Sequence, residues 1–294
     1  MSKELDNNIN HIMAVVDPTT SRGSTLKRSF RMAKTYGSAK VTAYLCIYSS
    51  YQVADRENLI EVEKDRHQLW LQKHIADMDT EGVEYDIVID WDKDWEEAIP
   101  AAAQRLAPDL VVKASHRRSA GSRKGILRRR STEAQRKLRT SDRRLIRNAT
   151  CPILFVKGPW KEAPRKLLVA MDLSTDEEAY KKLDERVLEF GKAFVSRAPD
   201  REMHVVNAAE SWDKFVHPPD LAKAAGIERE FAHIAEGSPT EVIAQVAEEI
   251  DANLLVIGTV GRSGAAGLRI GNTAERILDR VQMDTLVLTV PEQG

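Results

Sequence analysis

Short apolar runs alternate with longer amphipathic stretches along the whole chain. The apolar runs lie near 12–16, 41–48, 84–89, 109–114 and 152–157 in residues 1–158, and near 166–171, 202–207, 229–234, 253–258 and 285–290 in residues 165–294. Runs as apolar as LLVIG (254–258) and TLVLTV (285–290) are typical of parallel strands buried on both faces. The pattern predicts an α/β fold with two tandem doubly wound domains, each a parallel five-stranded sheet with helices on both faces.

The second half of the sequence repeats the first at a spacing of 144 residues. This spacing carries DWEEAIPAAAQRL (94–106) onto SPTEVIAQVAEEI (238–250) and aligns Ile99 with Ile243. Residues 157–166 include two prolines and form a short linker between the halves. We therefore predict domains at 1–158 and 165–294, and we expect them to sit against each other.

The last predicted strand of each half would be an exposed edge in an isolated domain. Pairing 152–157 with 285–290 inside one chain removes both edges, so we expect the domains to join through these strands. The second half has only the 20 residues 208–227 between its second and third strands, where the first half has a long amphipathic stretch. This shorter connection is expected to leave apolar surface that a homodimer could cover.

Five glycines lie within fourteen positions that begin at the end of the strand predicted at 253–258. They are Gly258, Gly261, Gly264, Gly267 and Gly271. Glycine permits close approach of bare backbone, and the carboxyl ends of parallel strands and the N-termini of helices are common anion sites. The cluster therefore predicts a phosphate-binding loop, although the glycines could also serve only to make a tight, flexible loop. Neither GxxxxGK[ST] nor GxGxxG is present.

The glycine spacing carries a resemblance to a known family. Gly258, Gly261 and Gly271 form G-x2-G-x9-G, followed by Asn272 where Ser or Thr is usual, and the first strand of this half ends in Asp172. In these features the sequence resembles the tandem members of the universal stress protein family, over about residues 10–292.

The resemblance implies a stress-response regulatory protein that binds ATP or a related adenine nucleotide in residues 165–294, and Mg²⁺ could accompany the nucleotide. Asp172 would face the ribose and adenine. Val205 would end the second strand and line the adenine pocket through its backbone. Residues expected around the phosphates are Gly258, Gly261, Gly271, Asn272 and Thr273. A sensor of another phosphate-bearing ligand is an alternative.

The first half lacks this loop. Ala114 and Arg117 stand at the positions of Gly258 and Gly261, and a side chain there would obstruct a phosphate. Lys113 takes the place of Ile257. It is expected either to pair with Asp17 or, with His116 and Arg117, to attract another anion. This domain is therefore predicted to be a degenerate, structural partner.

Positive charge is concentrated in residues 117–147. This segment holds thirteen Arg or Lys and two acids, whereas the whole chain has a formal net charge of -1. It could bind nucleic acid or the ribosome, but it contains no aromatic residue for base stacking. The other interpretation is a helix whose basic face is solvated or paired with acids elsewhere in the chain, because Leu138, Leu145 and Ile146 are spaced to pack on the sheet.

Several classes of protein and site are not indicated. Cys46 and Cys151 form no CxxC pair, and no metal-ligand motif is present. The polar start of the chain and the absence of any apolar run of membrane-spanning length predict a cytoplasmic protein without membrane contact. No catalytic motif is present, so an enzyme is not indicated beyond slow ATP hydrolysis.

Overall fold

The computed structural model describes residues 9–18, 24–37, 39–47, 56–92, 94–115, 140–158, 165–173, 177–209, 211, 215–261 and 272–291. The first half contains β1 (His11–Val15), α1 (Ser24–Tyr36), β2 (Lys40–Ile47), α2 (Arg56–Ala76), β3 (Tyr85–Trp91), α3 (Trp95–Leu106), β4 (Leu110–Ala114), α4 (Thr140–Arg147) and β5 (Ile153–Val156). The second half contains β6 (Lys166–Met171), α5 (Glu178–Val195), β7 (Glu202–Ala209), α6 (Pro218–Ala225), η3 (Arg229–Phe231), β8 (Ala232–Glu236), α7 (Pro239–Glu249), β9 (Leu254–Gly261), α8 (Asn272–Arg280) and β10 (Asp284–Pro291).

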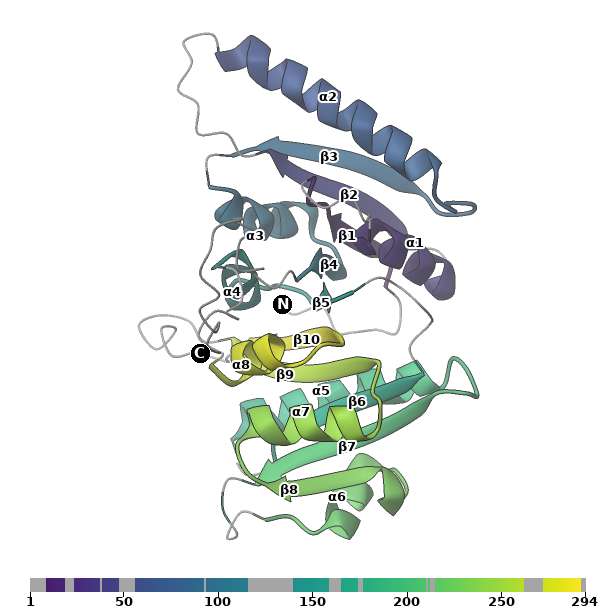
Figure 1. The fold of residues 1–294 in the computed structure, drawn as a ribbon, viewed down its shortest axis with the longest axis vertical. Coiled ribbons are helices and arrows are strands. Elements are labelled where there is room, and N and C mark those ends of the chain that lie inside the picture. The colour runs from purple at the N-terminus through teal and green to yellow at the C-terminus, as the bar shows by residue number, and fades with distance from the viewer. Residues whose placement is uncertain are drawn as a thin grey trace, which may run out of the picture.

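The described strands form one ten-stranded sheet in the order β3-β2-β1-β4-β5-β10-β9-β6-β7-β8 (Figure 1). Each half contributes five parallel strands in the same relative order, with its first strand in the middle. The halves meet at β5 and β10, which are antiparallel, with Phe155 opposite Thr285 and Ile153 opposite Val287. The predicted fold class and the predicted pairing of the last strands are confirmed.

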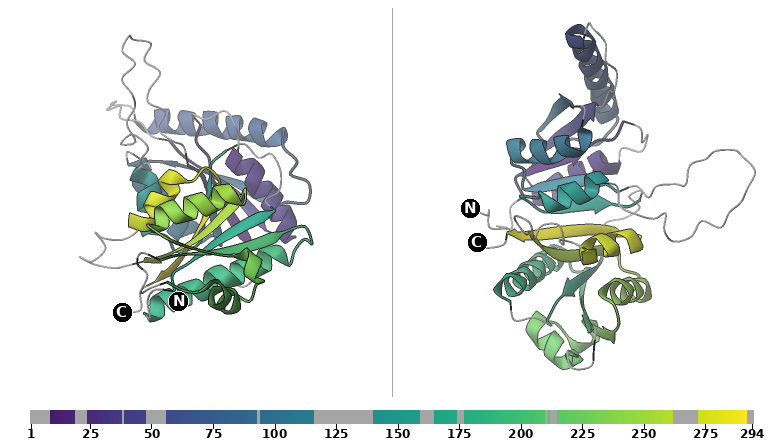
Figure 2. Two further views of the ribbon diagram at one scale, coloured as in Figure 1. Left: turned by 60° about the horizontal axis from the view of Figure 1, so that its bottom comes forward. Right: turned by 90° about the vertical axis from the view of Figure 1, so that its left-hand side faces the viewer.

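Helices cover both faces of this sheet (Figure 2). On one face, side chains of α1, α2, α5 and α6 join a core that includes Phe30, Leu71 and Val187. On the other face, α3, α4, α7 and α8 contribute to a second core that includes Leu145 and Ile277. Each core contains residues from both halves. The two domains therefore share their apolar interior across the seam, which is the junction of β5 and β10.

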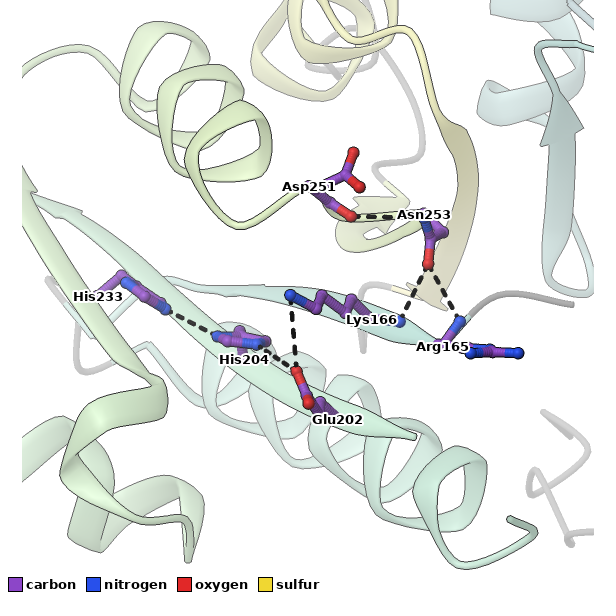
Figure 3. Close-up of polar contacts among 7 residues, drawn as sticks. All are labelled: Arg165, Lys166, Glu202, His204, His233, Asp251 and Asn253. Atoms are coloured by element: carbon purple, nitrogen blue, oxygen red, sulfur yellow. Dashed lines mark hydrogen bonds and ion pairs between the residues drawn. The ribbon is translucent and has the colours of Figure 1, made fainter. Parts of the chain in front are cut away.

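The internal repeat extends to individual hydrogen bonds. In the first half, the Asp109 carboxylate accepts the N–H groups of Asn10 and His11, both at 3.0 Å. In the second half, Asn253 Oδ1 accepts those of Arg165 and Lys166, at 3.1 and 3.2 Å (Figure 3). Asp109 and Asn253 are 144 residues apart, which is the spacing of the sequence repeat. Both residues connect the start of the central strand to the strand beside it.

Ion pairs also connect the two halves. Arg28 on α1 lies 2.5 Å from Asp284 at the start of β10, and both side chains are largely buried. The other oxygen of Asp284 accepts the backbone N–H of Lys157 at 2.9 Å. The guanidinium of Arg197, after α5, lies over the ring of Tyr36 at 4.7 Å from its centroid. The expectation that the domains sit against each other is therefore met.

Two features of the second half differ from the sequence prediction. The third strand begins at Ala232 rather than near 229, because Arg229–Phe231 form a 3-10 helix. The strands expected at 202–207 and 253–258 continue to Ala209 and Gly261, so Gly258 lies within β9. In addition, none of the helices in the described part of the chain combines the length and apolarity needed to cross a membrane.

Candidate functional site

The central strands of the second half separate at their carboxyl ends. The ladder between β6 and β9 covers three residue pairs and ends at Val169 and Val256. The ladder between β9 and β10 continues much further, to Gly261 and Pro291. The last part of β9 is therefore paired with β10 and has left the ladder with β6. Ligands of open α/β sheets bind at the carboxyl ends of the strands, where two neighbouring strands lead to opposite faces of the sheet. Here β6 is followed by α5 and β9 by α8, which pack on opposite faces.

Asp172 lies directly after β6, at this separation, and it is exposed. Its backbone N–H donates to Asp184 Oδ1 on α5 at 3.1 Å. Asn207 of β7 donates from Nδ2 to the carbonyl of Met171 at 3.2 Å. Both Asp184 and Asn207 are buried, at 9% and 2% exposure. The backbone that carries Asp172 is thus fixed from α5 and from β7.

Asp184 is an acid on the buried side of a helix, beside Leu183 and Val187. Burial raises the pKa of its carboxyl to about 6, the N–H of Asp172 opposes this rise, and the negative charge of Asp172 adds to it. Sequence reasoning missed this residue. The available signal was an Asp at an apolar position of an amphipathic helix, which indicates a specific buried partner.

Gly258 is required by packing. An added Cβ would lie 2.3 Å from Cγ of Leu183, so α5 lies directly against β9 at this position. The space beside Gly258 on this face of β9 is therefore filled by a leucine. Its predicted contact with phosphates depends on the family resemblance alone.

The other predicted phosphate-loop residues lie at the two ends of the loop or within it. Gly261 is the last residue of β9, and Asn272 and Thr273 are the first two residues of α8. Thr273 is exposed. Gly271 and residues 262–270 lie outside the described part of the chain. The end of β9 and the start of α8 therefore lie on either side of residues 262–271, and the contact of these residues with phosphates stays a prediction.

The expected position of Val205 is wrong. It lies in the middle of β7, paired with Val169 and Ala232, and is 0% exposed. The strand ends at Ala208 and Ala209, because its buried run continues through the polar Asn207. The backbone that reaches the carboxyl end of β7 is that of these two alanines.

In the first half, a buried ion pair lies between the corresponding strand, β4, and the corresponding helix, α4. Nζ of Lys113 on β4 contacts Oδ1 of Asp142 on α4, and the two residues are 5% and 0% exposed. Ser115 Oγ lies 3.5 Å from the other oxygen of Asp142. Lys113 thus forms a buried ion pair with Asp142, a partner that the sequence analysis did not predict. His116 and Arg117 lie outside the described residues.

The second half has apolar residues at both positions of this pair. Lys113 corresponds to Ile257 in the strand repeat, and Asp142 corresponds to Ala274 when the helices are aligned on the buried Leu145 and Ile277. Asp142 lies in the first turn of α4, where a helix favours negative charge. In the first half, the carboxylate of Asp142 therefore supplies negative charge at the N-terminus of α4.

The arginines of α4 are paired with acids. Arg144 lies 3.2 Å from Asp94 and 2.7 Å from Glu97 near the start of α3. Arg143 and Arg147 both lie 3.2 Å from Glu275 on α8. For residues 140–147, the interpretation as a basic face paired with acids is confirmed. Residues 116–139 lie outside the described part of the chain.

A different polar cluster lies near the amino ends of β7 and β8 (Figure 3). His204 Nδ1 lies 3.0 Å from His233 Nε2, and its Nε2 lies 3.5 Å from Glu202. Burial lowers the pKa of both histidines. Within the described residues, no three His, Cys, Asp or Glu side chains are placed to hold a metal ion. We therefore interpret the cluster as a hydrogen-bonded histidine pair that connects β7 to β8.

Comparison with known proteins identifies the family. Two segments, residues 8–157 and 164–289, match the universal stress protein family. The chain belongs to this family. A relative named universal stress protein E homolog, from Haemophilus influenzae, is 26% identical over 94% of this chain and 96% of its own length. A universal stress protein structure from Archaeoglobus fulgidus is 17% identical and covers 98% of this chain and 99% of its own, with a TM-score of 0.69.

Two shorter structures of the family are described with nucleotides. A universal stress protein in complex with cAMP is 24% identical and covers 43% of this chain and 98% of its own, with a TM-score of 0.31. A family protein from Arabidopsis thaliana with AMP bound is 22% identical and covers 45% of this chain and 93% of its own, with a TM-score of 0.29. The bound nucleotides are those of these two proteins.

Proposed function

We propose that this protein is a cytoplasmic stress-response regulator whose C-terminal half binds ATP or a related adenine nucleotide, while its N-terminal half is structural. The observation that carries the proposal is the separation of β9 from β6 directly beside Asp172. The first half supports the division of roles, because the Asp142 carboxylate lies in the first turn of α4, where the second half has the apolar Ala274 and negative charge from a ligand would be favoured.

Each site residue has an expected role in this proposal. Asp172 faces the ribose and the adenine. Gly261, Gly271, Asn272 and Thr273 surround the phosphates, where the start of α8 favours negative charge. Gly258 acts indirectly, by letting α5 approach β9. The adenine meets the backbone of Ala208 and Ala209 rather than that of Val205. Mg²⁺ would be held mainly by the phosphates and water.

The decisive variant is Gly261→Val. A branched side chain at the end of β9 obstructs phosphate approach, so this variant is expected to lose the thermal shift that ATP gives the parent protein. At a hundred times the dissociation constant, ATP should add about 2.7 kcal/mol, or roughly 5–10 °C. Differential scanning fluorimetry with and without ATP measures both values.

Gly158→Val is the matched control, because nothing lies within 4 Å of a Cβ at that position. It should keep the full ATP shift. Mass analysis of material that absorbs near 260 nm after the purified protein is denatured would identify a retained ligand. A parent protein that shows no shift with any adenine nucleotide, or a Gly261→Val variant that shifts normally, rejects the proposed pose.

A further inference from the structure

Helix α2 presents apolar side chains to solvent at one end of the molecule. It lies beyond β3, the edge strand of the sheet (Figures 1 and 2). Its inner side packs Leu71 and Ile75, both 0% exposed, into the core. Leu59, Val62 and Leu69 are 46%, 60% and 59% exposed. Single exposed apolar residues are ordinary, but three on one helix need an explanation.

These three side chains form a stripe along α2. Val62 follows Leu59 by three residues and Leu69 follows Val62 by seven, so at 3.6 residues per turn all three lie on one side of the helix. This is the spacing by which one helix packs against another. The other exposed large apolar residue in the described chain, Tyr85, packs edge-on against Phe30, with ring centroids 5.7 Å apart.

Charge is divided between the two ends of α2. Residues 58–65 contain Glu61, Glu63, Asp65 and one lysine, whereas residues 66–76 contain two basic residues and no acid. With neutral histidines, the first segment has a net charge of −2 and the second of +2. Two such helices side by side repel when parallel and attract when antiparallel.

We propose that α2 is a docking surface for a second copy of this chain, with the two α2 helices packed antiparallel about a twofold axis. This arrangement brings Leu59 of each copy opposite Leu69 of the other, and Val62 of each copy opposite the aliphatic part of the exposed Arg66 of the other. A 21-residue helix is about 31 Å long, so the contact is at the small end of specific interfaces. We therefore expect a reversible dimer with a micromolar dissociation constant.

Sedimentation velocity of the full chain, from about 1 µM to about 1 mM, tests the association. The expected result is a monomer at the lowest concentrations and a dimer at the highest. A chain that stays monomeric throughout overturns the proposal, because the stripe is then covered within the chain or by a different partner.

Two single variants test the surface. Leu59→Glu and Leu69→Lys each place a charge opposite a leucine twice in the symmetric dimer, and each should weaken association at least about tenfold. Gln68→Glu is the control, because Gln68 is exposed on α2 but lies away from the stripe. It should dimerise like the parent, and circular dichroism checks that all variants fold. Unchanged dimers in both stripe variants overturn the proposal.

Mixing the two stripe variants tests the antiparallel direction. In a mixed dimer, the introduced carboxylate at position 59 faces the introduced ammonium at position 69, and the remaining Leu69 and Leu59 face each other. The mixture should therefore form heterodimers at concentrations where each variant alone is monomeric. A parallel pair of helices would not place these charges together, so a mixture that stays monomeric overturns the antiparallel arrangement.

Discussion

At the scale of single residues, the candidate site depends on side chains that contact no ligand in the proposed pose. Gly258 permits the close approach of Leu183, and Asp184 accepts the N–H of Asp172. Both contacts connect α5 to the carboxyl end of the sheet. The position of Asp172 therefore depends on α5 as well as on β7, and substitutions on α5 should alter the site without contacting the ligand.

Asp184→Asn should change how stability depends on pH. In the folded chain the pKa of Asp184 is about 6, above its ordinary value of 3.8. Ionisation of this carboxyl therefore costs stability, and the cost appears as pH rises from about 4 to about 6 and is complete above that. The asparagine variant, which stays neutral and can still accept the Asp172 N–H, should be about 2 kcal/mol more stable than the parent at pH 8.

Urea unfolding of both proteins at pH 3.5 and pH 8 measures this difference, which should be small at the lower value, where the carboxyl is mostly protonated in both the folded and the unfolded chain. Burial lowers the pKa of His204 and His233, so these histidines reduce stability as pH falls. Because both proteins contain them, their effect cancels in the comparison. A variant that is equally destabilised at both pH values would mean that Asp184 is ionised and held by its hydrogen bond throughout.

At the scale of elements, the sequence predicted the strands well and their carboxyl ends poorly. Apolar runs identify a buried strand, but they do not show where the strand leaves the core, so β7 extended past the expected end and Val205 fell in its interior. The start of β8 was displaced because Arg229–Phe231 form a 3-10 helix. Asp142 was counted only as one of two acids in a basic segment, since its burial depends on how α4 packs on β4.

Converting the Lys113–Asp142 pair to the residues of the second half tests the role of this pair. Lys113→Ile alone leaves a fully buried carboxylate without its cation, which should cost about 3–5 kcal/mol of unfolding free energy. The double variant Lys113→Ile, Asp142→Ala should return to within about 1 kcal/mol of the parent, because apolar replacement of a buried pair is often neutral. Urea unfolding measures all three proteins. A double variant that loses as much stability as Lys113→Ile alone, or more, would show that the unpaired carboxylate is not the cause of the loss.

At the scale of the whole molecule, one sheet and two shared cores make the halves a single structural unit. The seam between β5 and β10 is supported by Asp284, which contacts Arg28 and the N–H of Lys157. Burial raises the pKa of Asp284 and lowers that of Arg28, although each charge opposes the shift of the other. The halves are thus coupled by charges that have little access to water.

Asp284→Ala should weaken this coupling. Losing one member of a buried ion pair costs about 3 kcal/mol or more, and the loss falls at the seam. Scanning calorimetry is expected to show one transition for the parent protein and a lower, broader or divided transition for the variant. Asp200→Ala is the control, because Asp200 forms an exposed pair with Arg165 and should cost less than about 1 kcal/mol. If Asp284→Ala shows the same transition as Asp200→Ala, the ion pair of Asp284 contributes little to the stability of the junction between the halves.

The antiparallel joining of β5 to β10 also restricts how this protein can mix with its relatives. Where two separate subunits meet along such strands, either can dissociate and recombine with a different chain. Here each last strand is already occupied by a partner on the same polypeptide, whose effective concentration exceeds that of any free competitor. Each molecule should therefore keep the two halves with which it was synthesised, and heteromeric exchange across this seam should not occur.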